Sequence, residues 1–147
     1  MHRKDPVFLT QTDTTTGFVS QSAGRLTQVK QRPPHKHYIK ALPSLWALKS
    51  LVRVPERHKN RIRRSRQTTF IFPNGDSYRI IKEKYHLSLI QKLGWAYTTS
   101  ANLSGESFDL NFADDAADII VGYPNKKNIK SASAILKLNN IRLKRIR

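Results

Sequence analysis

The 147-residue sequence contains no cysteine. This absence excludes disulfides, thiolate nucleophiles and every zinc or iron–sulfur site that depends on cysteine ligands. Long hydrophobic runs are missing as well: no apolar segment approaches the roughly 18–20 residues of a transmembrane helix. No signal-peptide core of adequate length follows residues 1–6. We therefore expect a soluble, cytoplasmic protein without a membrane partner.

Acidic residues are scarce. The chain carries 27 Lys and Arg against 10 Asp and Glu, a formal net charge of +17. Such an excess indicates anionic partners, namely phosphate polymers, nucleotides or an anionic membrane face, and says nothing about the fold. The hydrophobic share is only 38%. The length then favours a single domain over residues 1–147, with a thin core and a heavily charged surface.

The positive charge is concentrated in the first part of the chain, where residues 1–66 hold 15 basic and 3 acidic residues. The densest stretch is residues 53–66, in which Glu56 is the one acidic residue. If this segment is helical, Ile62 offers its apolar contact, and a helix that is polar on all sides lies at the surface. Two interpretations stay open: a solvated face, or a strip that binds RNA phosphates. The RNA-binding candidates are Arg57, Arg61 and Arg64.

Short apolar runs recur along the chain and alternate with segments of helical spacing. Strands are predicted at residues 7–9, 38–42, 70–72, 78–81, 95–97, 118–121, 133–138 and 141–146, and helices at 23–30, 44–51 and 87–93. Strands that alternate with helices, together with hairpins, indicate an α/β domain with a mixed, twisted sheet.

Three segments have the composition of ligand-binding loops. Residues 12–17 place hydroxyl groups after a predicted strand, where α/β folds bind ligands, although turn and capping roles fit as well. In residues 30–36, alternate basic side chains of an extended segment would point the same way and suit a polyphosphate. Residues 98–105 are expected to form a loop whose small residues let backbone N–H groups approach an anion.

Signatures of other chemistries are missing. The sequence has no Gly-Lys-Ser/Thr phosphate loop and no Gly-x-Ser-x-Gly nucleophile elbow. His35 and His37 have no third ligand nearby, so we interpret them as surface histidines. The carboxylates of residues 109–118 are interpreted as helix-terminus groups and not as a magnesium site. No side-chain metal site is predicted.

The order of the motifs resembles the YrdC family. Thr-x-Thr-x-x-Gly stands at residues 12–17, Lys-x-Arg-Pro at 30–33, Thr-Ser-Ala-Asn-x-Ser-Gly at 99–105 and Ser-x-Ile at 133–135. Members of this family are threonylcarbamoyl-AMP synthases, nucleotidyltransferases that perform the first step of threonylcarbamoyladenosine modification in transfer RNA. The resemblance implies one YrdC-like domain: a twisted, open mixed sheet with flanking helices and a basic concave face.

The resemblance also implies substrates and site residues. The substrates would be L-threonine, bicarbonate or CO2, and ATP with Mg²⁺; further partners would be tRNA and the proteins that transfer the threonylcarbamoyl group. Lys30 and Arg32 would be catalytic. The nucleotide would be held by Lys30, Arg32, Ser100, Asn102 and Arg145, with Lys36 nearby, and threonine by Thr12, Thr14, Arg79 and Ser133.

Several positions depart from the family pattern. Gln11 replaces a proline, Thr16 a tyrosine, Ile81 a proline and Ala134 a threonine, and Arg66-Gln67 stands near the place of a Gly-Pro pair. These departures keep two alternatives open. One is a non-catalytic YrdC-like module that binds double-stranded RNA or tRNA, and the other is a carbamoyl-adenylate activity that serves hydrogenase maturation.

Overall fold

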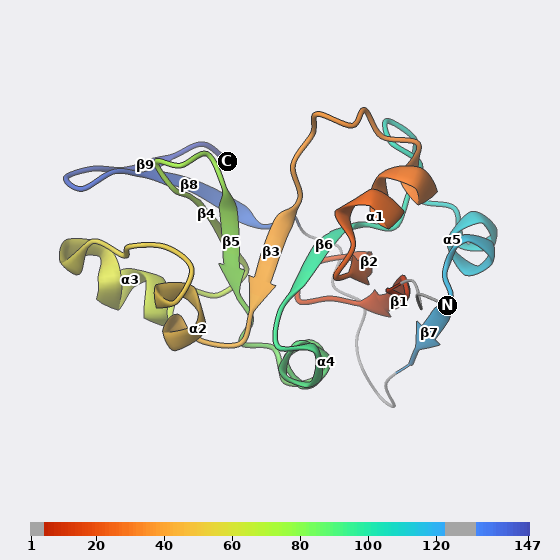
Figure 1. The fold of residues 1–147 in the computed structure, drawn as a ribbon, viewed down its shortest axis with the longest axis horizontal. Coiled ribbons are helices and arrows are strands. Elements are labelled where there is room, and N and C mark those ends of the chain that lie inside the picture. The colour runs from red at the N-terminus through yellow and green to blue at the C-terminus, as the bar shows by residue number, and fades with distance from the viewer. Residues whose placement is uncertain (1–4, 123–131) are drawn as a thin grey trace.

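The computed structural model describes residues 5–122 and 132–147. Within these ranges nine strands form one sheet in the order β7-β1-β2-β6-β3-β5-β4-β8-β9 (Figure 1). The strands are β1 (Phe8–Gln11), β2 (Thr16–Ser20), β3 (Ile39–Leu42), β4 (Thr68–Ile71), β5 (Ser77–Ile80), β6 (Ala96–Ser100), β7 (Ile119–Val121), β8 (Ala134–Leu138) and β9 (Leu143–Arg145). The helices are α1 (Ala23–Lys30), α2 (Leu45–Lys49), the 3-10 turn η1 (Glu56–His58), α3 (Lys59–Arg64), α4 (Lys84–Leu93) and α5 (Leu110–Ala116).

The sheet is mixed. The neighbours β1 and β7, β3 and β5, and β4 and β8 run parallel. The pairs β1 and β2, β2 and β6, β3 and β6, β4 and β5, and β8 and β9 are antiparallel. The expected α/β class with a mixed sheet is therefore confirmed.

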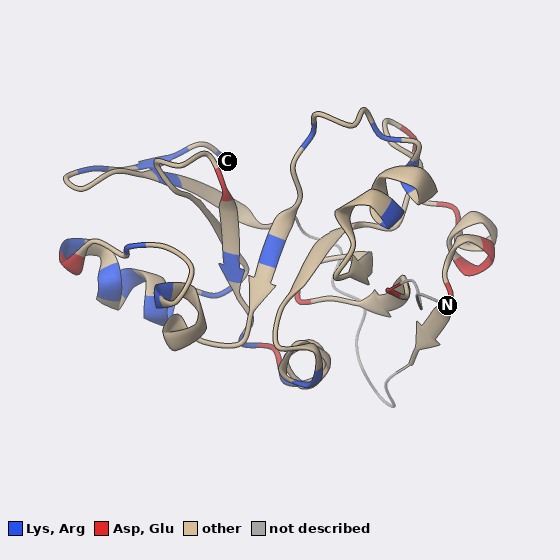
Figure 2. Cartoon of the chain, viewed as in Figure 1, with Lys and Arg blue, Asp and Glu red and all other residues tan. Residues whose placement is uncertain are grey.

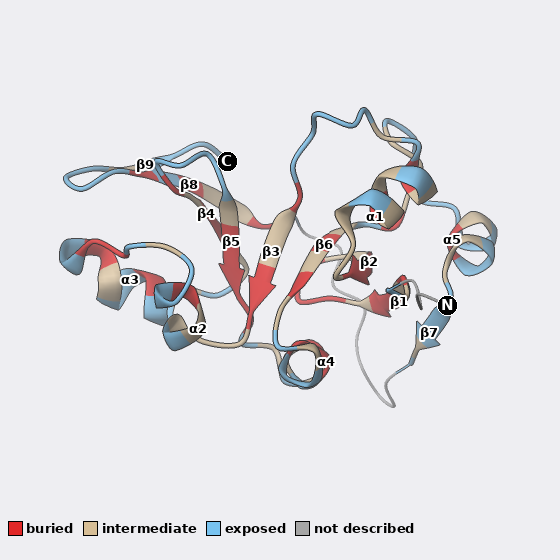
Figure 3. Cartoon of the chain, in the orientation of Figure 1, coloured by how far each residue is buried: buried red, intermediate tan, exposed pale blue. Residues whose placement is uncertain are grey.

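Three apolar clusters hold the helices on the sheet, and the buried residues concentrate on its central strands (Figure 3). Leu48 of α2 and Ile62 of α3 pack into one cluster together with Phe70 and Leu136 of β4 and β8. Leu26 of α1 and Ala113 of α5 belong to a second cluster around β1 and β2. Leu89 and Ile90 of α4 join a third, beneath β3 and β6.

Helix α1 has well-defined ends, and its C-terminal end sets the direction of the chain beyond it. The Ser22 side chain accepts a hydrogen bond from the Arg25 N–H at the first turn, as an N-cap does. At the other end Gln31 adopts a left-handed conformation with φ 51°, and its N–H donates to the Gln28 carbonyl. The chain turns there, so Lys30 ends the helix and Arg32 begins the next segment.

Three sequence-based expectations need correction. Residues 98–100 do not belong to a loop: they extend β6, because Thr98, Thr99 and Ser100 pair with β2. Strand β2 is not among the predicted strands, since its first two residues belong to the hydroxyl-rich segment 12–17. Helix α5 is not among the predicted helices either, although Asp109 caps it by accepting from the Asn111 N–H, as its interpretation as a helix-terminus group implies.

Segment 30–36 also differs from the expectation of alternate basic side chains on one extended strand. The left-handed Gln31 turns the chain between Lys30 and Arg32, and Lys30 is buried whereas Arg32 is partly exposed.

Among the described residues, no helix has both the length and the apolarity required to cross a bilayer.

Candidate functional site

A cavity of about 280 Å³ opens where several strand ends meet. It receives residues from the turn between β1 and β2, the segment after α1, the interior of β5, the end of β6 and the segment before β8. Its lining comprises Thr12, Thr14, Thr15, Arg32, His37, Tyr38, Ile39, Arg79, Thr98, Thr99, Ser100, Ala132, Ser133 and Arg147. The long separations in sequence show that the fold, not a local motif, assembles this cavity.

The turn that follows β1 is held by its own hydroxyl groups. The Thr12 hydroxyl donates to the Thr15 carbonyl at 2.7 Å and accepts from the Thr14 N–H at 3.2 Å. Gly17, at the start of β2, lets this turn lie against β6: a Cβ atom at this position would be 2.7 Å from the Thr99 carbonyl oxygen and 2.9 Å from the Thr12 methyl carbon. The Thr12 and Thr14 hydroxyls lie 3.2 Å apart, and both residues line the cavity.

A buried ion pair lies beneath the same turn. The Arg79 Nη1 is 2.9 Å from Asp13 Oδ1, and the two side chains are 6% and 3% exposed. Arg79 also donates from Nε to the Thr69 hydroxyl at 3.1 Å, and that hydroxyl lies 2.9 Å from the Ser133 hydroxyl. Asp13 neutralises Arg79, so the pair contributes orientation and little net charge. Among the described atoms, the second Asp13 oxygen is buried and accepts no hydrogen bond.

Arg147 extends this network, and sequence reasoning missed it. Its Nε donates to the Ser133 carbonyl at 2.9 Å and its Nη2 to the Ser133 hydroxyl at 3.3 Å. The N–H groups of Ile146 and Arg147 both donate to the Ile135 carbonyl, so two residues of one chain segment oppose one of the other, as in a β-bulge. Arg145 of β9 pairs with Leu136 of β8 and does not line the cavity. Arg145 and Arg147 both follow Ser133 at short distance in the sequence, so this spacing does not indicate which of the two arginines lines the cavity.

Arg32 and Lys30 occupy different environments. Arg32 lines the cavity, its Nη2 donates to the His37 carbonyl at 3.0 Å, and its guanidinium carbon lies 4.6 Å from the centre of the Tyr38 ring. Lys30 is buried and does not line the cavity. Its Nζ donates to the carbonyls of Ser100 at 2.6 Å and Asn102 at 2.9 Å. Burial, and after it the charge of Arg32, lowers the pKa of Lys30 to about 8.

The loop that follows β6 is organised from within. The Asn102 side-chain amide donates to the carbonyls of Leu103 and Glu106, both at 2.8 Å, and the Ser104 N–H donates to the Lys30 carbonyl at 3.0 Å. Ser100 reaches the cavity, whereas Asn102 does not line it. Lys30 and Asn102 thus hold the loop in place, and Ser100, the last residue of β6, lines the cavity.

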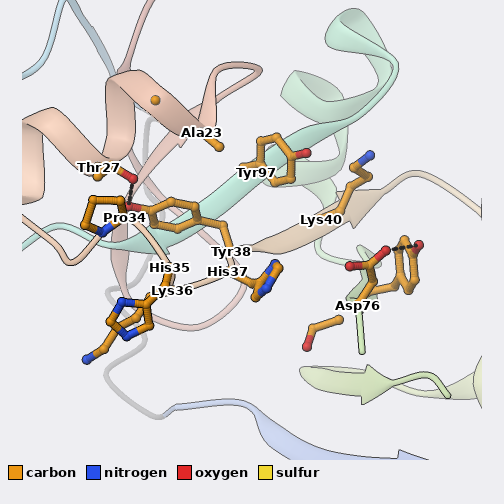
Figure 4. Close-up of a pocket in the computed structure, with 13 residues that line it drawn as sticks. Ala23, Thr27, Pro34, His35, Lys36, His37, Tyr38, Lys40, Asp76 and Tyr97 are labelled. Carbon is orange, nitrogen blue, oxygen red and sulfur yellow. Dashed lines mark hydrogen bonds between the residues drawn. The ribbon is translucent and has the colours of Figure 1, made fainter. Parts of the chain in front are cut away.

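A larger hollow of about 620 Å³ adjoins the cavity and shares His37 and Tyr38 with it. Figure 4 shows Lys40 and Asp76 at one end of this hollow and Thr27, Pro34, His35 and Lys36 at the other, with Tyr38 between them. The Tyr38 hydroxyl lies 2.9 Å from the Thr27 hydroxyl, and this contact holds Tyr38 against α1. Lys36 lines this hollow and not the smaller cavity.

Side chains of the described residues do not form a metal site. No group of three or more His, Cys, Asp or Glu lies close enough together in that part of the chain to hold an ion. The Asp118 carboxylate accepts instead from the Val7 N–H at 2.9 Å and pairs with Arg25 at 2.8 Å, and these two contacts lower its pKa. In the described part of the chain, the charged side chains that line the cavity are those of Arg32, Arg79 and Arg147, and Asp13 pairs with Arg79.

Similar proteins place this geometry in a known fold. No protein-family model matches the chain. The uncharacterized protein MG259 of Mycoplasma genitalium is 31% identical over 99 residues, which are 67% of this chain and 21% of MG259. Among solved structures, P. abyssi Sua5 complexed with L-threonine has a TM-score of 0.78 at 17% identity, over 97% of this chain and 50% of Sua5. E. coli YciO has a TM-score of 0.74 at 15% identity, over 97% of this chain and 82% of YciO.

These likenesses define the class of fold. The chain has the YrdC-like fold of Sua5 and YciO, which confirms the architecture that the motif order implied. The chain spans 50% of the length of this Sua5 and 21% of MG259.

Proposed function

We propose that the protein is a threonylcarbamoyl-AMP synthase, which forms threonylcarbamoyl adenylate and pyrophosphate from L-threonine, bicarbonate or CO2, and ATP for tRNA modification. The observation that carries the proposal is the convergence of six sequence-predicted substrate residues on one cavity. These are Thr12, Thr14, Arg32, Arg79, Ser100 and Ser133. In support, a protein of the same fold, P. abyssi Sua5, has been solved with L-threonine.

The hydroxyl-rich end of the cavity suits the amino acid. Thr12 and Thr14 offer fixed hydroxyl groups, and Arg79 is held in place by Asp13 and Thr69 through Nη1 and Nε. Arg79 would meet the threonine carboxylate with its remaining N–H groups, in the charge-assisted geometry that guanidinium groups favour. Asp13 reduces the positive electrostatic potential at this end of the cavity. The orientation of the Arg79 guanidinium, and not its net charge, would therefore select the substrate.

The arginine end of the cavity suits phosphate. Arg32 and Arg147 line it without an acidic partner among the described residues, whereas Arg79 is neutralised by Asp13. Two unneutralised guanidinium groups match the oxygens of a polyphosphate. The adjoining hollow, with its tyrosine and histidine side chains, offers room for the nucleoside of ATP. Mg²⁺ would arrive bound to the phosphates of ATP as part of the substrate.

The reaction needs little covalent help from the protein. The threonine amine bonds to the carbon of CO2 and loses a proton, which leaves a carbamate. A carbamate oxygen then bonds to the α-phosphorus of ATP, and the bond from that phosphorus to the bridging oxygen breaks, so pyrophosphate leaves. Positioning and neutralisation of charge dominate such phosphoryl chemistry. Removal of one charge-stabilising contact typically costs about 2.7–4 kcal/mol of barrier.

The test is pyrophosphate release by the purified protein with ATP, Mg²⁺ and bicarbonate, with and without L-threonine. The proposal expects release that depends on threonine and falls roughly 10²–10³-fold in Arg32→Gln. Arg142→Gln removes the same charge from an exposed site outside the cavity and should leave turnover unchanged. Release without threonine would contradict the assignment. No turnover together with salt-sensitive RNA binding would favour the non-catalytic RNA-binding module.

A further inference from the structure

A ridge of arginines lies on η1 and α3, away from the cavity. Arg57, Arg61 and Arg64 are exposed, and their spacing of four and three residues aligns them along one side of the helical segment. At about 1.5 Å per residue, the ridge is about 10 Å long. Figure 2 shows α3 among the most densely basic parts of the molecule, at the end opposite to the acidic α5.

Contacts on this segment leave the positive charge largely uncompensated. Glu56, the one acidic residue of the segment, pairs with Lys59 at 2.5 Å. Arg57 donates to the Ile141 carbonyl at 3.1 Å, which fixes its guanidinium beside the β8–β9 turn without neutralising it. Arg61 and Arg64 have no acidic partner among the described residues. They line a surface hollow of about 380 Å³ together with Ser65, Thr68 and the apolar core residues Phe70 and Leu136.

An exposed aromatic side chain lies in the same helical layer. Leu48 of α2 and Ile62 of α3 are buried in one cluster, so both helices cover the same part of the sheet (Figure 1). Trp46 precedes Leu48 by two residues on α2 and therefore points away from that cluster, with 82% of its surface exposed. Guanidinium groups for phosphates and an exposed ring for a base are the two elements of single-stranded RNA binding.

We propose that the ridge of Arg57, Arg61 and Arg64, together with Trp46, binds RNA through its phosphates and one unpaired base at a surface separate from the cavity. A membrane surface fits less well, because Ile62 is fully buried and the ridge therefore has no apolar face to insert. The planar guanidinium fork matches phosphate oxygens, and the Ser65 and Thr68 hydroxyls add donors beside it. This surface is independent of whether the cavity catalyses the reaction proposed above.

The test compares two triple variants of equal charge for binding to a fluorescently labelled RNA hairpin. R57Q/R61Q/R64Q removes the ridge, and K82Q/K84Q/K92Q removes three exposed charges on and beside α4. With about 0.7 counterions released per phosphate contact, loss of three contacts lowers the slope of log K against log salt by about 2 and the affinity at about 0.15 M salt on the order of 50-fold. The α4 variant should keep the wild-type slope.

Three outcomes would overturn the proposal: equal losses in both triple variants, no loss in the ridge variant, or loss on anionic phospholipid vesicles with RNA binding intact. Trp46→Ala tests the base contact separately, and it should weaken binding to the hairpin at least about fivefold while leaving a blunt RNA duplex unaffected. Pyrophosphate release should be the same in the ridge variant and the wild type. This readout distinguishes failure of the RNA surface from failure of the proposed enzyme activity.

Discussion

The buried pair of Asp13 and Arg79 gives a quantitative prediction about how the cavity is held together. The two groups are 2.9 Å apart, and both side chains are almost fully buried. Asp13→Asn leaves the guanidinium uncompensated, and Arg79→Met leaves the carboxylate uncompensated. Removing one partner of a buried ion pair typically costs about 3–5 kcal/mol. Each single variant should lose this amount of unfolding free energy.

The size of this loss makes it measurable. Domains of this size have an unfolding free energy of about 5–15 kcal/mol, so the loss is at least about a fifth of the total. For roughly 150 residues, each kcal/mol shifts the midpoint of thermal unfolding by about 2–4 °C. The singles should therefore unfold about 6–20 °C below the wild type, as measured by circular dichroism and by urea titration.

A double variant separates the pair from its surroundings. Asp13→Asn combined with Arg79→Met removes both charges, so its loss should be smaller than the sum of the two singles by about 2 kcal/mol. Arg25→Gln is the matched control: it breaks the partly exposed bridge to Asp118 and should cost at most about 1 kcal/mol. Additive losses in the double variant, or single variants as stable as Arg25→Gln, would show that Asp13 and Arg79 do not stabilise the fold as a pair.

Three further predictions concern other parts of the site. Arg147→Ala should weaken ATP binding, seen as a raised KM for ATP with an unchanged KM for threonine, because Arg147 is assigned to the phosphate end; an equal effect on both substrates would contradict this. Gly17→Ala should destabilise the fold by about 1–3 kcal/mol in urea titration, since its Cβ would meet the Thr99 carbonyl at 2.7 Å. The lowered pKa of Lys30, about 8, means that the unfolded state holds a proton that the folded state lacks between about pH 8 and 10.5. The unfolding free energy should therefore rise with pH in that window, and this rise should be absent in Lys30→Met. Identical pH profiles of the wild type and Lys30→Met would exclude a lowered pKa of Lys30.

Much of the fold follows from local sequence patterns. Apolar periodicity predicts α1 and α4, and Gly94 ends α4 with φ 85°, as a C-terminal glycine does. The hairpin of β8 and β9 across the Asn139–Asn140 turn is also predicted. These elements depend on contacts between residues close in the chain, which short-range spacing encodes.

The elements that sequence patterns miss depend on contacts between distant residues. Strand β2 contains Gly17, whose place against Thr99 follows from pairing with β6 and not from strand propensity. Arg79 meets Asp13 across 66 positions of sequence. Lys30 gives no sign in sequence that its ammonium turns inward to backbone carbonyls. Arg147 reaches Ser133 through a bulge that simple alternation does not predict.

The membership of the candidate site is therefore more predictable than its geometry. Motif order predicts six of the substrate residues that line one cavity, while Lys30, Asn102 and Arg145 lie outside its lining. The first two have a visible structural role in the loop after β6. Their proposed part in nucleotide binding remains a prediction.

Mass spectrometry of the product formed from ATP, L-threonine and ¹³C-labelled bicarbonate tests directly whether the protein makes threonylcarbamoyl adenylate. We expect an adenylate that contains threonine and one labelled carbonyl carbon, and that is absent when threonine is omitted or when Arg32 is replaced by glutamine. An adenylate without the label, or AMP formed at the same rate without threonine, would contradict this expectation.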